Sequence, residues 1–169
     1  MLNLLSRTWV LVGLFIAMMV IGYSFSSAQD ATGGVLLDML GTGAEAKVRL
    51  AEMSAEQKTA HFWTTVLNDT AYPLAYGGLL IGLIWRFAGT LRRWFVLPAF
   101  AVIAADLSEN ATQALALTGN EALIGLKDIL TPVKFGLFAL AAVLALTSIG
   151  LAAVQEYPVS LASYSRCAN

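Results

Sequence analysis

The sequence predicts an all-α integral membrane protein, an antiparallel bundle of four transmembrane helices with short amphipathic helices in the first periplasmic loop. Hydrophobic residues make up 58% of the 169 residues and charged residues only 12%, a composition typical of helical membrane proteins. Four apolar runs are each long enough to cross a bilayer as a helix. These runs are residues 8–27, 69–89, 94–117 and 129–151. We expect the whole chain, residues 1–169, to form a single transmembrane domain.

The first apolar run, residues 8–27, follows Arg7 and ends in small residues that resemble a signal-peptidase site. Two interpretations compete, a cleaved signal peptide and a retained membrane anchor. The run is longer than the apolar core of a typical signal peptide, so we expect a retained membrane helix.

The one sizeable polar excursion spans residues 28–65. Residues 34–40 have the pattern of a short interfacial helix that is stopped by Gly41. Thr42 and Ser54 each begin a capping-box pattern, which predicts two further helices, the second of them continuing into the next membrane segment. We expect these helices to cap the bundle, with a lid or a partner-docking surface as the alternative.

Each of the three later apolar runs contains a proline near its start, where the missing N–H costs little, and the prolines of the third and fourth runs are placed in the first turn. The prolines are Pro73, Pro98 and Pro132. In the second run Gly78 and Gly82 form a small-xxx-small pair, which allows another helix to approach closely.

Arginines determine the predicted topology. Arg86, Arg92 and Arg93 surround the turn between the second and third runs, and the positive-inside rule places such a turn in the cytoplasm. Both termini are then cytoplasmic as well. The excursion 28–65 and the turn 118–128 are then outside, which is the periplasm in a bacterium.

Polar residues on three of the predicted helices converge in the outer half of the bilayer. Ionisable groups at that depth are costly and usually face the protein interior, where they find partners. The spacing places the members of each helix on one face. The expected polar cluster consists of Asn68, Asp69, Tyr72, Tyr76, Asp106, Glu109, Asn110, Gln113, Thr131 and Lys134.

Lys134 is the expected centre of this cluster, because an unpaired ammonium is expensive inside a membrane. We predict a direct contact with Asp106 or Glu109 and a secondary partner in Thr131 or Asn110. Lys127 shares the face of Lys134 but is placed nearer the surface. The network either fixes helix register or, because its carboxyls cannot all ionise cheaply, serves acid–base catalysis or a proton relay through Asp106, Glu109 and Lys134.

A third interpretation is the binding of a lipid, quinone or pigment between the helices, with Tyr72, Tyr76 and Phe135 as walls. No metal site is expected, because the lone His61 lacks a Cys or His partner and is assigned to the interfacial aromatic belt. The single Cys167 excludes a disulfide within the chain. Near-zero net charge gives no indication of nucleic-acid binding.

Two motifs, Asp-x-x-Glu-Asn at 106–110 and Thr-Pro-x-Lys at 131–134, resemble segments of small proteins of the bacterial inner membrane, which is the expected location. The sequence lacks an affinity tag and a recognisable active-site motif. Together with the small-residue helix faces, this favours a non-catalytic accessory subunit that packs against other subunits of a larger membrane complex, respiratory or photosynthetic in type. The alternative is an intramembrane enzyme, proton-coupled carrier or lipid-binding protein that uses the polar cluster.

Overall fold

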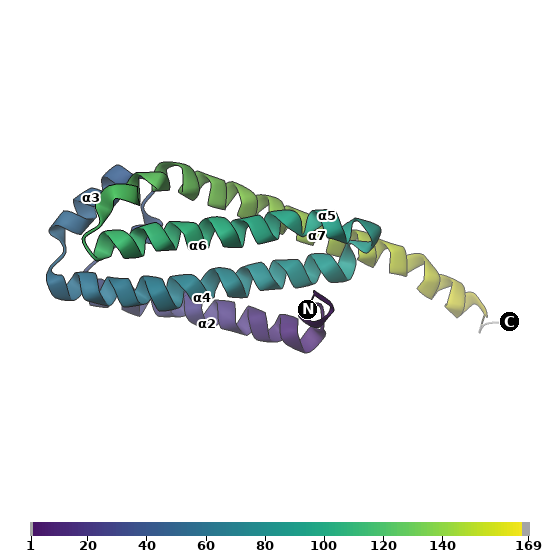
Figure 1. Cartoon of the computed structure of the whole chain (residues 1–169). Coiled ribbons are helices and arrows are strands. Elements are labelled where there is room, and N and C mark those ends of the chain that lie inside the picture. Colours follow the sequence, from purple (N-terminus) through teal and green to yellow (C-terminus); the bar gives the residue numbers. More distant parts are fainter. Residues whose placement is uncertain (1, 167–169) are drawn as a thin grey trace.

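The computed structural model describes residues 2–166, and the side chains of residues 2–154. Within residues 2–166 the chain is helical and contains no strand, so the predicted all-α class is confirmed. The long helices lie side by side (Figure 1) and are α2 (Thr8–Thr32), α4 (Ala55–Phe87), α6 (Leu97–Leu117) and α7 (Lys127–Arg166). The short elements are α1 (Leu2–Leu5), η1 (Leu37–Met39), α3 (Gly43–Glu52), η2 (Gly89–Leu91), α5 (Arg92–Phe95) and η3 (Glu121–Leu126).

Two of the described helical stretches are long and apolar enough to cross a membrane. One is α2, and the other runs from Glu121 through η3 into α7 as far as Val154. Helix α4 lies centrally, with contacts to α2, α6 and α7, and α6 also packs against α7. Helices α4 and α6 contribute most of the polar residues that the site contains.

The excursion after α2 differs in part from the prediction. Helix α2 continues to Thr32, past the predicted boundary at 27, and ends at Gly33, whose φ of 73° is left-handed. The expected interfacial helix over 34–40 is reduced to the single turn η1. The two capping boxes are confirmed, because Thr42 and Ser54 both bond the backbone three residues on and receive the reciprocal side-chain bond.

Helix α4 is one continuous element of 33 residues, with Pro73 in its interior. The expectation that Pro73 lies in an early turn of its helix is therefore wrong, because the helix starts much earlier, after the Ser54 cap. Proline has no N–H, so the carbonyl of Asp69, four residues back, loses its helical donor. The Asn110 side chain on α6 supplies the replacement, with Nδ2 donating to this carbonyl at 2.5 Å.

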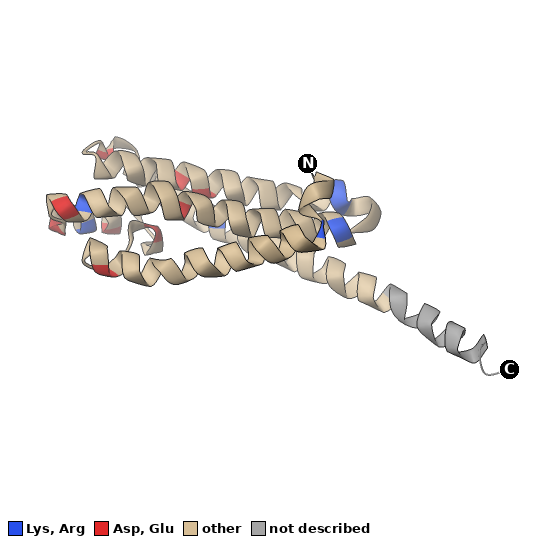
Figure 2. Cartoon of the chain, turned by 90° about the horizontal axis from the view of Figure 1, so that it is seen from below, with Lys and Arg blue, Asp and Glu red and all other residues tan. Residues whose placement is uncertain are grey.

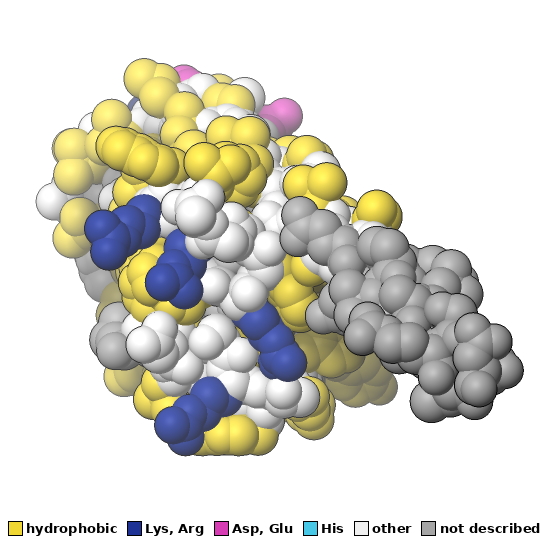
Figure 3. Space-filling view, turned by 90° about the vertical axis from the view of Figure 1, so that its right-hand side faces the viewer, with side chains coloured by type: hydrophobic (Ala, Val, Ile, Leu, Met, Phe, Trp, Pro, Cys, Tyr) yellow, Lys and Arg dark blue, Asp and Glu magenta, His cyan; other side chains and the backbone are white. Residues whose placement is uncertain are grey.

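The two ends of the bundle differ in composition. The polar end carries η1, α3, η3, most of the acidic residues and also several basic residues, whereas the opposite end carries basic residues with few acids (Figure 2). We call that opposite end the arginine end, and Figure 3 views it directly. Its exposed arginines are Arg7, Arg86, Arg92 and Arg93.

Apolar and small side chains hold the arginine end together. Its core includes Ile81, Ile84 and Val102, none more than 2% exposed. Gly82 allows α1 to come close, since a Cβ at this glycine would lie 2.5 Å from the Leu5 carbonyl oxygen. The other buried members of this core are Tyr76, Leu80, Val96, Ala99, Ala141 and Ala145.

The third and fourth predicted runs are also adjusted. The third is divided at Val96 into α5 and α6, with Pro98 in the first turn of α6 as predicted. The fourth begins at Lys127 and extends to Arg166, beyond the predicted end at 151, and Pro132 is its sixth residue. Cys167 lies outside the described residues.

Candidate functional site

Lys134 on α7 is the centre of the polar cluster. Its Nζ lies 2.6 Å from Asp38 Oδ1, 2.8 Å from Glu109 Oε2 and 3.6 Å from Asp106 Oδ1. The residue is only 4% exposed. The predicted contact of Lys134 with Asp106 or Glu109 is confirmed, and both acids take part.

Glu109 on α6 joins two lysines. Its Oε1 accepts hydrogen bonds from Lys127 Nζ and, at 2.8 Å, from Thr131 Oγ1. Glu109 and Lys127 are both fully buried, so Lys127 belongs to the buried network together with Lys134. Lys127 is the first residue of α7 and directly follows η3. Thr131 is a partner of Glu109 rather than of Lys134.

Asp106, one turn before Glu109 on α6, is bound by a tyrosine. Tyr76 on α4 donates its O–H to Asp106 Oδ2 at 2.7 Å, and both residues are buried. This bond connects α4 to the ion pairs of α6 and α7, so three long helices contribute to one network.

The sequence interpretation missed Asp38, which comes from η1 in the polar excursion. The backbone N–H of Leu37 donates to His61 Nε2 at 2.9 Å, and Leu37 is fully buried. This anchor presents Asp38 to Lys134. The available signal was an isolated acid in the apolar stretch 35–40, which an exposed interfacial helix would explain equally well.

His61 is also placed differently from the prediction, because it is fully buried beneath η1 and not in an interfacial belt. It lies in the first part of α4, before the predicted membrane segment 69–89. Burial lowers the pKa of His61 below its usual 6.5, and the nearby Arg49 charge acts in the same direction. The neutral ring accepts from Leu37 at Nε2 and therefore carries its hydrogen on Nδ1, 3.3 Å from Thr65 Oγ1.

Five predicted members lie outside the ion-paired group, and one of them, Tyr72, lines the pocket described below. Asn68 donates instead to Ser24 Oγ on α2 at 2.9 Å. Asn110 bonds the Asp69 carbonyl, as described above. Asp69 Oδ2 and both amide atoms of Gln113 are buried without a hydrogen-bond partner among the described residues.

A pocket of about 210 Å³ lies beside the cluster. Phe135 and Phe138 on its wall are 58% and 41% exposed, so the pocket opens at the surface of the bundle. Tyr76 packs edge-to-face with Phe138, with ring centroids 5.2 Å apart. The lining residues are Asp38, Tyr72, Tyr76, Asp106, Lys134, Phe135 and Phe138.

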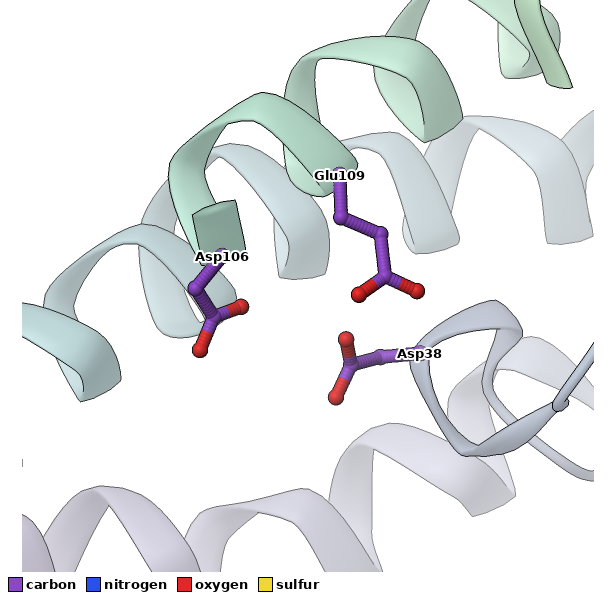
Figure 4. Close-up of side chains that lie close together, drawn as sticks. All are labelled: Asp38, Asp106 and Glu109. Atoms are coloured by element: carbon purple, nitrogen blue, oxygen red, sulfur yellow. The ribbon is translucent and has the colours of Figure 1, made fainter. Parts of the chain in front are cut away.

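Three carboxylates converge at this place, from η1 and α6 (Figure 4). Oxygens of Asp38, Asp106 and Glu109 lie within 4.8 Å of one another. The ammonium of Lys134 contacts all three and occupies the position that a hard cation would need. The arrangement is therefore a set of ion pairs at the edge of an aromatic pocket.

Comparisons of this chain with protein-family models, with curated proteins and with solved structures find no match. The interpretation of the site therefore depends on its own geometry.

Proposed function

We propose that this chain is a four-span protein of a bacterial inner membrane whose polar cluster binds the head group of a membrane-dissolved amphiphile. The observation that carries this proposal is the pocket, which joins buried charges to a wall of exposed aromatic residues. Its volume is below the roughly 300–1,000 Å³ of drug-sized sites. That size suits a head group whose apolar tail remains in the lipid.

The membrane arrangement has its own support. Helix α2 and the Glu121–Val154 stretch have the length and composition of membrane spans, and α4 and α6 pack beside them. The exposed arginines at one end match the positive-inside rule, which places both termini in the cytoplasm and the polar end in the periplasm.

Cysteine labelling tests this topology. In a Cys167→Ser background, single cysteines replace Glu45 on α3 and Thr90 on η2. We expect an impermeant maleimide added outside intact cells to label position 45 only. Labelling of position 45 from the cytoplasmic side alone would contradict the topology.

Native mass spectrometry of the protein, released from its membrane in mild detergent, tests the binding function. We expect the chain to retain one small molecule. A Tyr76→Ala variant, which removes part of the pocket wall, should lose it, whereas the matched Tyr23→Ala variant on exposed α2 should keep it. A bare chain in all three samples would contradict the proposal.

A second candidate function is the accessory subunit expected from the sequence, a partner of a respiratory or photosynthetic type of complex. The observation that favours it is the wide apolar face of α2, on which Phe15, Met19 and Tyr23 are each more than half exposed. Recovery of the chain in a stoichiometric assembly by the same mass spectrometry would support this candidate. Acid–base chemistry or a proton relay through Asp106, Glu109 and Lys134 stays a prediction from the sequence.

A further inference from the structure

We propose that the head group bound in this pocket is a primary ammonium, a cation that donates hydrogen bonds. The inference rests on the proposed binding function and specifies the chemistry of its ligand. It comes from one juxtaposition, in which an aromatic pocket meets three carboxylates that outnumber the two lysines paired with them.

The cationic group beside the pocket is already paired with carboxylates. Lys134 Nζ donates a hydrogen bond to Asp38 and lies 2.8 Å from Glu109 Oε2 and 3.6 Å from Asp106 Oδ1. Tyr76 donates its O–H to Asp106. Among the pocket-lining residues, Tyr72 has the one O–H without a described partner, so an anionic head group would have to compete with these carboxylates for Lys134.

Acceptors, by contrast, remain available. An ionised carboxylate offers about four lone-pair sites, and the hydrogen bonds of Asp38 and Asp106 within the cluster use only some of them. The Asp38 side chain is 33% exposed, so a ligand can reach it.

The charges favour a cation as well. Three carboxylates, those of Asp38, Asp106 and Glu109, face the two ammonium groups of Lys127 and Lys134. The excess negative charge is costly in a buried site unless a carboxyl takes up a proton or a cationic partner neutralises it. A cationic ligand removes this excess, whereas an anionic ligand increases it.

The walls suit an organic cation. Aromatic faces attract ammonium groups when the charge lies within about 6 Å of the ring centroid. Lys134 Nζ already lies 5.3 Å from the Phe135 centroid, and Tyr72, Tyr76 and Phe138 supply further rings around the same space. An apolar cavity of about 150 Å³ can hold benzene, so this pocket has room for a probe the size of benzylamine.

Four soluble probes of matched size separate the alternatives: benzylammonium, benzyl alcohol, benzaldehyde and benzoate. They represent a cationic donor, a neutral donor, a neutral acceptor and an anion. Binding to the full chain in a neutral sugar detergent is measured by calorimetry and by saturation-transfer NMR. We expect benzylammonium to bind about tenfold or more tightly than benzyl alcohol, and benzoate to bind weakest.

Two variants and a control locate the effect. Asp106→Asn keeps an acceptor for Tyr76 but removes a charge, and should abolish most of the preference for the cation. Phe138→Leu removes a ring without changing charge and should weaken benzylammonium more than benzyl alcohol. Glu121→Gln, at an exposed acid on η3, should behave as the unaltered chain.

Equal affinity for the cation and the alcohol, preference for benzaldehyde or benzoate, or no binding of any probe would each overturn the inference. If Asp106→Asn fails to fold, two measurements still test the inference. They are the affinities of Phe138→Leu for benzylammonium and benzyl alcohol, and the order of the four probe affinities for the unaltered chain. The proposed function is judged separately, because a neutral molecule retained in native mass spectrometry would support the pocket while contradicting its cationic ligand.

Discussion

At the polar end of the bundle the helices meet through ion pairs and hydrogen bonds, whereas at the arginine end they meet through apolar and small side chains. Glu109 contacts two lysines and a threonine from α7 at the polar end. At the arginine end Gly82 lies against the Leu5 backbone, and Ile84 is fully buried in the apolar core.

This difference indicates that the contacts that fix helix register are not the contacts that supply the apolar packing. In a membrane, apolar side chains pack against lipid tails about as well as against other helices, so apolar contacts specify register weakly. A buried charge without its partner is expensive. We therefore infer that the polar end fixes the register of α4, α6 and α7. This register then determines which apolar side chains pack together at the arginine end.

Glu109→Gln is expected to have the largest effect, because it leaves Lys127 and Lys134 without a shared counter-charge. Breaking one side of a buried ion pair typically costs about 3–5 kcal/mol. The free energy of unfolding in mixed micelles, titrated with a denaturing detergent, measures the loss. The exposed Glu121→Gln variant is the control and should leave stability unchanged.

Replacing Glu109 and Lys127 together by Leu and Met should recover much of that loss, since Lys134 keeps Asp38 and Asp106. A cost below about 1 kcal/mol for Glu109→Gln alone would mean that the cluster is solvated and does not fix register. Equal stability of the single and double variants would show that Lys127 does not depend on Glu109.

At the arginine end, Gly82→Ala is expected to cost about 1–3 kcal/mol, the usual range for overpacking. The added Cβ would lie 2.5 Å from the Leu5 backbone oxygen, so α1 must move away. Gly78→Ala is the matched control, because its Cβ would lie 3.4 Å from a Leu14 side-chain atom and can be accommodated. The same unfolding titration should show a loss for position 82 only; equal losses at both positions would contradict the close approach of α1.

Asn110→Ala is expected to cost about 1–2 kcal/mol, because the Asp69 carbonyl freed by Pro73 would lose its donor. A double-mutant cycle with Pro73→Ala tests the cause. Alanine at 73 restores the helical N–H, so Asn110→Ala should cost clearly less in that background. Additive effects of the two substitutions would show that Asn110 does not replace the missing donor.

The smallest expected effect is a dependence of stability on pH through His61. Its folded pKa is below 6.5 because of burial, so at pH values below 6.5 the unfolded chain binds a proton that the folded chain does not. The free energy of unfolding should therefore fall as pH drops from 6.5 toward the lower folded pKa. Comparison of unfolding at pH 7.5 and 5.5 checks this, and His61→Gln should reduce the difference. Greater stability at the lower pH would contradict a neutral His61.

The sequence predicts the local features of the polar end better than its long-range contacts. Helical periodicity and the capping patterns at Thr42 and Ser54 depend on nearby residues, so they were predicted well, as was the contact of Lys134 with the acids on α6. Asp38 could not be found, because its position depends on the long-range bond between Leu37 and His61. The burial of Lys127 and the role of Asn110 at Pro73 also depend on neighbouring helices.

Photocrosslinking in the native membrane tests the central claim, a ligand pocket beside the polar cluster, most directly. A photoreactive benzoylphenylalanine replaces Phe138 in the pocket wall or, as the control, Leu140, which is 48% exposed on the same helix. The account predicts that position 138 captures one predominant small molecule, while position 140 captures the mixture of bulk lipids. The same lipid mixture at both positions would show that the pocket is only a surface hollow and would contradict the account.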